Sequence, residues 1–352
     1  MEKMYMDYKT LQMYIYEMNE DEKFYKDYYF AKQQQYSLEK FLAEIDYEDV
    51  MKRHLLITEL PETIPPVFED YFFFDPMENN SITAMKHNRY APALFHNHTF
   101  FELVYVYDGK CKQKFLHTEY ELRTGDICII PPGIEHSIWV NDESIILNVL
   151  IKKDRLHTIF FNFLNTKNIL SSFFLNNIYA HRANDYIIFH TGNDYEMRRG
   201  FLYILWETIN KALYYDELMG STLMLIFGLL IRNYENTAEM PIFAHKTDVQ
   251  RYALIHYIQE NYATVRLEDI ARRFHYTPEY ASKLIKETTG MTFTEITQQV
   301  RIEKAQDMLV NTNMPIAMIS ADVGYDATEH FIRLFKKHTK MTPSQFRKVH
   351  SK

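Results

Sequence analysis

The sequence holds little of the residue types that mark secreted, membrane-spanning or unstructured chains. It has two cysteines, Cys111 and Cys128, and no Cys-x-x-Cys motif, so a disulfide framework is excluded and we interpret both as reduced thiols. With 9 glycines and 11 prolines in 352 residues, long flexible or low-complexity segments are not expected. Residues 1–10 have no apolar signal core, and the most apolar window, residues 218–231, is too short to cross a bilayer. We therefore expect a cytoplasmic protein with no membrane partner.

Basic residues are concentrated at one end of an acidic chain. The net charge of -8 argues by itself against a nucleic-acid partner. Residues 246–352, however, hold 16 Lys and Arg against 12 Asp and Glu, a balance of +4, which leaves 23 basic and 35 acidic residues in the remainder. An acidic body with a mildly basic tail indicates that DNA, if it binds, binds at the tail.

The length predicts two or three domains, and residue patterns divide the chain further. Residues 1–70 have helical spacing and few breakers. Residues 71–154 contain β-branched and aromatic runs between turn residues, which is typical of an antiparallel barrel. These runs are residues 101–107, 126–130 and 144–149. Residues 155–240 return to helix, with two apolar faces that pair in a homodimer or cover the barrel, and both interpretations stay open. A linker is predicted over residues 236–247.

The tail, residues 248–350, contains an internal repeat. Four residues with helical spacing recur forty-nine positions later, and each set precedes a break and a second short helix. The first helices carry Leu267, Ile270, Ala271 and Phe274 or Ile316, Ile319, Ser320 and Val323, and the second carry Ala281, Leu284 and Ile285 or Phe331, Leu334 and Phe335. Two short helices joined by a tight turn, with a small residue where they cross, describe a helix-turn-helix.

A longer helix is predicted between the two motifs, over residues 294–311. A rigid connecting helix would hold the second helices of the two motifs about 34–36 Å apart, one turn of B-DNA. Gly324 suits a turn position with positive φ. Thr277 before Pro278 suits a helix N-cap. The tail therefore predicts an all-α double helix-turn-helix.

Residues 250–349 resemble the AraC-type (AraC/XylS) family of bacterial transcription regulators. The resemblance rests on Leu267-x-x-Ile270-Ala271, Arg301-Ile302-Glu303-Lys304-Ala305, Ile316-Ala317-x-Ile319, Val323-Gly324-Tyr325, His330-Phe331, Phe335-Lys336-Lys337 and Met341-Thr342-Pro343. Tyr325, His330 and Lys340 depart from the family's usual Phe, Tyr and Gly. The resemblance implies a sequence-specific DNA-binding transcriptional regulator that binds operator or promoter DNA as a homodimer, with RNA polymerase as a further partner.

Side chains that point away from the packed faces of the second helices are candidates for reading bases. They are Glu279, Ser282, Lys283, Thr328, Glu329 and Arg333. Arginine can donate two hydrogen bonds to guanine, and glutamate can accept one from cytosine. Candidates for phosphate contacts, which position a protein without reading sequence, are Lys286, Arg301, Lys336 and Lys337. For each residue, the alternative is a solvated helix face.

The predicted barrel carries a second group of polar residues. Its motifs, His96-x-His98-x-x-x-Glu102 before Gly109 and Gly125 to Pro131-x-Gly133-x-x-His136, resemble the two cupin motifs. In metal-binding cupins the residues that match His96, His98, Glu102 and His136 are ligands, and this donor set suits Fe, Mn, Ni or Zn. Many regulators of the AraC type instead bind a small effector such as a sugar in this barrel. A transition-metal site, an effector site and a purely structural barrel all stay open.

Together these patterns predict a multidomain α+β protein. Its parts are an N-terminal helical extension (1–70), a cupin-like antiparallel β-barrel that binds an effector (71–154), a helical bundle for dimerisation or coupling (155–240) and a double helix-turn-helix (248–350). We expect a ligand-gated regulator rather than an enzyme, on the nucleoid when bound to DNA. An effector near the three histidines and Glu102 would change the spacing or freedom of the DNA-binding units. The alternative is a metal-dependent cupin enzyme with a DNA-binding appendage.

Overall fold

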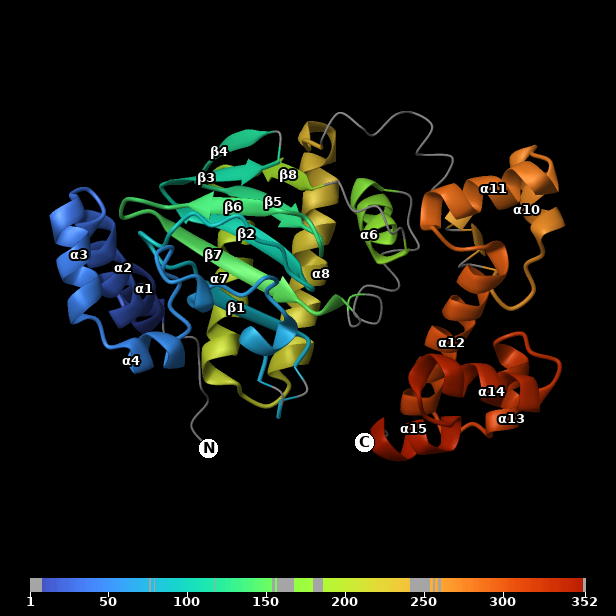
Figure 1. The fold of residues 1–352 in the computed structure, drawn as a ribbon. Helices are drawn as coiled ribbons and strands as arrows, with labels where there is room; N and C mark the ends of the chain where they lie inside the picture. Colours follow the sequence, from blue (N-terminus) through green and yellow to red (C-terminus); the bar gives the residue numbers. More distant parts are fainter. Residues whose placement is uncertain are drawn as a thin grey trace. The chain divides into compact units, whose positions relative to one another are not determined.

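The computed structural model describes residues 8–75, 77–78, 80–116, 118–153, 156, 168–179, 186–240, 254–255, 257–258 and 261–350. They divide into two compact units (Figure 1). The first contains the described residues up to 170 together with 186–240, and the second contains 171–179 and the residues from 254 onward. The first is a mixed sheet-and-helix unit and the second is all helical, which confirms the predicted α+β class. Among the described helices, none combines the length and the apolar character that a membrane span requires.

Two antiparallel sheets form the centre of the first unit. The five-stranded sheet has the order β1-β7-β2-β5-β8, and its strands are Ile82–Lys86, Ile145–Ile151, Phe101–Asp108, Asp126–Ile130 and Ile187–His190. The three-stranded sheet has the order β4-β3-β6, from Glu119–Arg123, Lys110–Phe115 and His136–Trp139. Residues from both sheets share one hydrophobic core. The three predicted runs lie in β2, β5 and β7, so that part of the strand prediction is confirmed.

The outer face of the five-stranded sheet is covered by two helices, α7 (Tyr195–Asn210) and α8 (Tyr215–Tyr234). Tyr105 of β2 stacks on Phe201 of α7 with ring centroids 4.1 Å apart. The predicted helical segment 155–240 also contains strand β8, so the prediction was wrong over residues 187–190. A short apolar run has no periodicity that separates a buried strand from a helix. Residues 241–247 of the predicted linker lie outside the described part of the chain.

The N-terminal segment forms α1 (Tyr8–Tyr16), α2 (Glu20–Ala31), α3 (Gln35–Glu44) and α4 (Tyr47–Lys52). Side-chain caps begin two of these helices: Asn19 forms a capping box with Glu22, and Asp46 accepts two backbone N–H groups at the start of α4. The 3-10 turns η1 (Pro61–Thr63) and η2 (Asp70–Phe72) then lead to the barrel. The helical prediction for this segment is confirmed over residues 8–52.

The second unit is all helical, and four of its shorter helices pack on a longer one. They are α6 (Ile169–Tyr179, from Ser171 onward), α10 (Leu267–Phe274), α11 (Pro278–Thr289), α12 (Phe293–Asn311), α13 (Ile316–Asp322), α14 (Thr328–Thr339) and α15 (Pro343–His350). Helix α12 matches the predicted connecting helix 294–311. Thr277 caps α11 by accepting from the Tyr280 N–H, and Pro278 occupies its first turn, as predicted.

A buried ion cluster joins the N-terminal helices to the barrel. Glu22 of α2 is fully buried, and its carboxylate accepts from Lys86 Nζ at 2.6 Å and Arg89 Nε at 2.8 Å. Lys86 Nζ also donates to the backbone carbonyl of Glu17 at 2.7 Å. Burial raises the Glu22 pKa, but hydrogen bonds from Arg89, Lys86 and the Asn19 backbone outweigh burial and hold this pKa below its ordinary value.

Glu22→Gln should destabilise the first unit by about 3–5 kcal/mol, because two buried cations lose their carboxylate. Both tryptophans, Trp139 and Trp206, belong to this unit, so urea unfolding followed by tryptophan fluorescence reports on it. A carboxylate with a lowered folded pKa stabilises above its ordinary pKa of 4.5 and loses that effect as pH falls, so the difference should shrink in acid. The exposed pair Glu20–Lys23 provides the control, Glu20→Gln. Equal effects of the two substitutions would contradict this account.

Candidate functional site

The first helix-turn-helix is formed by α10 and α11. Ala271 and Ala281 are buried where the two helices meet, so the small residue predicted at the crossing lies there. His275 ends α10 in the left-handed region, with φ of 57°, and its N–H donates to the Ala271 carbonyl. The chain then enters α11 through the Thr277 cap. The predicted helix-turn-helix geometry is present in this half.

The second helix-turn-helix is formed by α13 and α14. Ser320 is fully buried at the crossing, with Phe331 and Phe335 packed in the same core. Gly324 occupies the turn with φ of 88°, and a Cβ there would lie 2.1 Å from the Ala263 carbonyl oxygen. Only glycine fits this position, because φ is positive and because a side chain would meet the Ala263 carbonyl. The sequence pattern predicted the positive φ but not the close approach.

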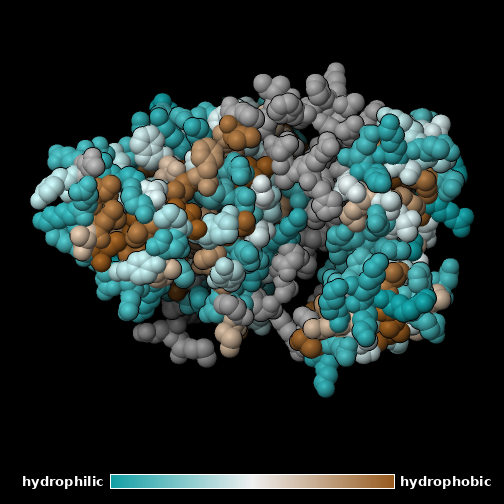
Figure 2. Space-filling view, in the orientation of Figure 1, coloured by the Kyte–Doolittle hydropathy of each residue, from teal (hydrophilic) through white to brown (hydrophobic). Residues whose placement is uncertain are grey.

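The second helix of each motif exposes most of the residues that the sequence assigns to base contacts. Glu279, Lys283, Glu329 and Arg333 are exposed, and Ser282 and Thr328 are half-buried on α11 and α14. The phosphate candidates Lys286, Lys336 and Lys337 are exposed as well. The surface of this unit is largely hydrophilic (Figure 2). These helices therefore leave charged faces uncovered within the unit.

Arg301 does not lie with the phosphate candidates. Its guanidinium is half-buried on α12, and Nε, Nη1 and Nη2 donate to the backbone carbonyls of Tyr262, Gly324 and Ala263. Three of its five N–H groups are thus used inside the protein, which argues against the phosphate contact expected from the sequence. The sequence motif around Arg301 resembles the family's motif but does not say which way the side chain points.

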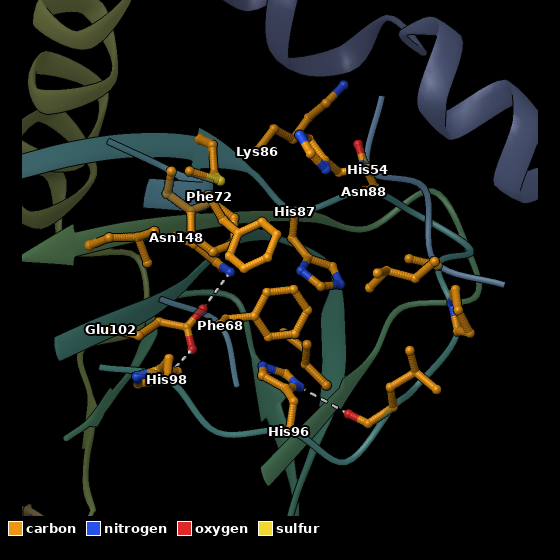
Figure 3. Close-up of a pocket in the computed structure, with 18 of the residues that line it drawn as sticks. His54, Phe68, Phe72, Lys86, His87, Asn88, His96, His98, Glu102 and Asn148 are labelled. Carbon is orange, nitrogen blue, oxygen red and sulfur yellow. Dashed lines mark hydrogen bonds and ion pairs between the residues drawn. The ribbon is translucent and has the colours of Figure 1, made fainter. Parts of the chain in front are cut away.

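The first unit encloses a cavity of about 210 Å³ beside β2 (Figure 3). Aromatic side chains form much of its wall: Phe68, Phe72, Phe73 and Phe100. His96, His98, Glu102 and Asn148 supply polar groups. His136 is not among the residues that line the cavity, although its Nε2 lies 3.2 Å from the Glu102 carboxylate. The fold therefore brings together the residues of the two cupin-like motifs, three of them at the cavity wall.

The three histidines are all oriented by backbone carbonyls. Nδ1 of His96, His98 and His136 lies 3.0, 2.7 and 3.0 Å from the carbonyl oxygens of Leu94, Phe100 and Ile134. A carbonyl only accepts, so each Nδ1 carries a proton, and each Nε2 is left to accept from a donor, to bind a cation or to carry a second proton. Hydrogen bonds of this kind fix the rings of metal-binding histidines.

Glu102 is the centre of this group. Its Oε1 accepts from Asn148 at 2.7 Å, while Oε2 faces Nε2 of His136 at 3.2 Å and of His98 at 3.4 Å. Burial raises the Glu102 pKa, but the two imidazoles outweigh burial and hold it well below its ordinary value. Burial lowers the His98 pKa and lowers that of His96 to about 4. Nε2 of His98, Nε2 of His136 and one carboxylate oxygen converge here, an arrangement that is stable only with a proton or a cation between them.

Two sets of cavity residues were missed by the sequence analysis. Asn148 is one residue of a buried strand and nothing in its local sequence marks it. Tyr25, His54 and Leu56 come from the N-terminal helical segment, which the sequence analysis treated as an extension without a role in binding. Contacts between segments so far apart in the chain leave no local pattern to detect.

Comparison with known proteins assigns both units. Residues 82–150 match the family described as "AraC-like ligand binding domain", and residues 270–349 match "Helix-turn-helix domain". The chain belongs to the AraC-type family of transcriptional regulators. The two matches cover the strands that carry the histidines and the helices from α10 to α15, so the resemblance seen in the sequence is confirmed.

Similar proteins of this AraC-type chain are named as regulators. The "HTH-type transcriptional activator RhaR" of Salmonella dublin is 25% identical over 78% of this chain and 94% of its own. The "Bifunctional transcriptional activator/DNA repair enzyme AdaA" of Bacillus subtilis is 37% identical over 26% of this chain and 44% of its own. The chain spans 12% to 51% of the length of the first three curated relatives it matches. The alternative of a cupin enzyme is not favoured by these names.

Solved structures also match this chain, over part of its length or over most of it. The C-terminal domain of AraT, a response regulator from Geobacillus stearothermophilus, is 31% identical and covers 29% of this chain and 87% of its own, with a TM-score of 0.28. The structure of ToxT from Vibrio cholerae is 15% identical and covers 77% of this chain and 100% of its own, with a TM-score of 0.32.

Proposed function

We propose that the protein is a sequence-specific regulator of transcription that binds double-stranded DNA through α11 and α14. The observation that supports this most is the presence of two complete helix-turn-helix motifs in one unit, each with an exposed second helix. Glu279, Ser282, Lys283, Thr328, Glu329 and Arg333 are the base-contact candidates. Lys286, Lys336 and Lys337 are the phosphate candidates, and Arg301 is left out because its donors are used internally.

A small effector is proposed to bind in the barrel cavity and to gate DNA binding. Lys86 lines the cavity, but its ammonium is held by Glu22 and by backbone carbonyls. Among the described residues of the wall, Glu102 is then the remaining carboxylate or ammonium group, and its oxygens face Asn148, His98 and His136. Such a wall repels anions, and phenylalanine rings favour the apolar faces of a ligand. A neutral hydroxylated molecule such as a sugar fits this chemistry.

The remaining parts of the chain receive proposed roles from their positions. Residues 71–154 are proposed as the effector domain and 248–350 as the DNA-binding domain. Leu218 and Leu225 of α8 are 40% and 57% exposed, which supports a homodimer formed through the helical segment 155–240. We further propose that the protein acts in the cytoplasm and that RNA polymerase is a partner. Binding of the effector is proposed to change the affinity for DNA.

Capture of genomic fragments by the purified full chain tests the regulator hypothesis. Sequencing should reveal enriched sites beside a small number of operons at physiological salt, and the products of those operons would name candidate effectors for binding assays. Fragments captured without sequence preference, or none, would contradict sequence-specific regulation.

Arg333→Ala should weaken binding to a captured operator by about 1–3 kcal/mol and relax preference at one position, because one bidentate base contact is lost. Lys337→Ala, a nearby substitution on α14, is the comparison. It should reduce the slope of log affinity against log salt by about one unit with no change in preference. Titrations at several salt concentrations on matched and mismatched operators measure both effects. Unchanged preference in Arg333→Ala would remove this residue from the base contacts.

A transition metal is a second candidate ligand of the barrel. The ligand atoms of His98, Glu102 and His136 all lie within 4.8 Å of one another and are buried. Two imidazole nitrogens and one carboxylate oxygen are a donor set that zinc, iron and manganese accept, with open positions for a further ligand. His96 was counted with this set in the sequence analysis, but it lies outside this three-residue group.

Elemental analysis of protein purified without a histidine tag tests the metal. We expect close to one equivalent of a transition metal in the wild type, loss in His98→Gln, and retention in His96→Gln, which changes a neighbouring histidine outside the group. Metal at background level in protein produced with supplemented Fe, Mn, Ni and Zn would exclude this candidate. Equal loss in both variants would contradict the assignment of the three ligands.

A further inference from the structure

A single arginine side chain joins the two helix-turn-helix motifs. Arg301 projects from α12, the helix that connects them. Its guanidinium donates from Nε to the Tyr262 carbonyl at 2.8 Å, from Nη2 to the Ala263 carbonyl at 2.9 Å and from Nη1 to the Gly324 carbonyl at 2.7 Å. All three guanidinium nitrogens therefore donate to backbone within the unit.

Two of the three carbonyls lie just before the first motif, and the third belongs to the second motif. Tyr262 and Ala263 lie in the turn that leads into α10, the first helix of the first motif. Gly324 lies in the turn of the second motif, between α13 and α14. One planar, rigid donor group thus ties the start of the first motif to the turn of the second, a task for which the fork of an arginine is suited and a lysine ammonium is not.

The backbone at this junction is in close contact. A Cβ on Gly324 would lie 2.1 Å from the Ala263 carbonyl oxygen, so the turn of the second motif packs closely on the turn that precedes the first. Two aromatic rings also lie beside cations here. The Arg301 guanidinium lies 5.3 Å from the ring centroid of Tyr325, and Lys304 Nζ lies 6.0 Å from the ring centroid of Tyr262. Contacts of this kind resist relative movement of the two motifs.

We propose that Arg301 is a positioning residue that fixes the distance and the rotation between α11 and α14. On this proposal Arg301 touches no DNA, and it acts by holding both second helices in register with successive turns of the major groove. The effect of Arg301 on DNA binding rests on the proposed function, whereas its role in holding α11 and α14 in place does not. Its structural part and its functional part can therefore be tested separately.

Spin labels test the structural part in the full chain without DNA. Labels at Lys283→Cys and Glu329→Cys, both exposed sites on the two second helices, report the distance between them. The native Cys111 and Cys128 are buried, and burial raises the pKa of Cys111 to about 12, so they react slowly. The unaltered junction should give one narrow distance distribution. Arg301→Lys, which keeps the positive charge and most of the stem, should broaden it.

Arg347→Lys is the matched control. Arg347 of α15 also donates to backbone carbonyls, but that of Leu309 lies in the last turn of α12 and that of Met314 lies between α12 and α13, so both are outside the first motif. Its substitution should leave the distance distribution unchanged. Gly324→Ala perturbs the junction from the opposite side and should broaden the distribution even where Arg301→Lys is tolerated. A narrow distribution in both junction variants would overturn the proposal.

Operator DNA tests the functional part. Inserting one base pair between the two half-sites rotates one against the other by about a tenth of a turn. The wild type should lose about tenfold in affinity on this insertion. Arg301→Lys should bind the original operator less tightly than the wild type does, but its affinity should fall little further on the insertion. Its salt slope should match the wild type, because no phosphate contact is removed. A slope lowered by Arg301→Met but not by Arg301→Lys, with spacing preference intact, would instead establish a phosphate contact.

The two tests fail in different ways. If the full chain captures no operator, the DNA-binding function is wrong, and the label distances still decide whether Arg301 fixes the two motifs. If operators are captured and the distances do not respond to the junction variants, the positioning role is wrong and the DNA-binding function stands.

Discussion

The pairing of β2 with β7 is the constraint on which most of the first unit depends. Both strands are buried on two faces, so side chains alternate between two different environments. Val104 and Val106 of β2 face the barrel core, and Glu102 on the same face reaches the cavity, while Tyr105 faces α7. A slip of one residue would place the carboxylate against the helices and a leucine in the cavity. The register that fills the core therefore also places the polar group of the site.

A buried ion cluster couples the N-terminal helices to the barrel. Glu22 neutralises Lys86 and Arg89, which stand on either side of His87, a residue of the cavity wall. The same segment contributes Tyr25, His54 and Leu56 to that wall. Because removal of the buried carboxylate takes from Lys86 its charged partner and from Arg89 its buried one, the segment and the cavity are coupled. A ligand that changes the cavity wall therefore acts on the helices as well.

The sequence predicted the features that follow from local patterns. Helical spacing repeated in the tail located α10, α11, α13 and α14, and the demand for positive φ located Gly324. The cupin-like spacing predicted that His98, Glu102 and His136 come together, and they do so from the segment before β2, from β2 and from the start of β6. Strand β8 was missed because a run of four residues is too short to show whether its spacing is that of a strand or of a helix. The Arg301 contacts and the cavity residues of the N-terminal segment were missed because they join segments distant in the chain.

Arg301 changes how the charge of the tail is understood. The balance of +4 over residues 246–352 counts Arg301 and Lys304 among the basic residues. Both are packed against backbone or aromatic rings, and burial lowers the Lys304 pKa to about 8. Fewer basic side chains are therefore left to contact phosphates directly than the sequence count implies. When general attraction is weak, affinity for DNA depends more on both second helices meeting the groove together, and that requires a fixed distance between them.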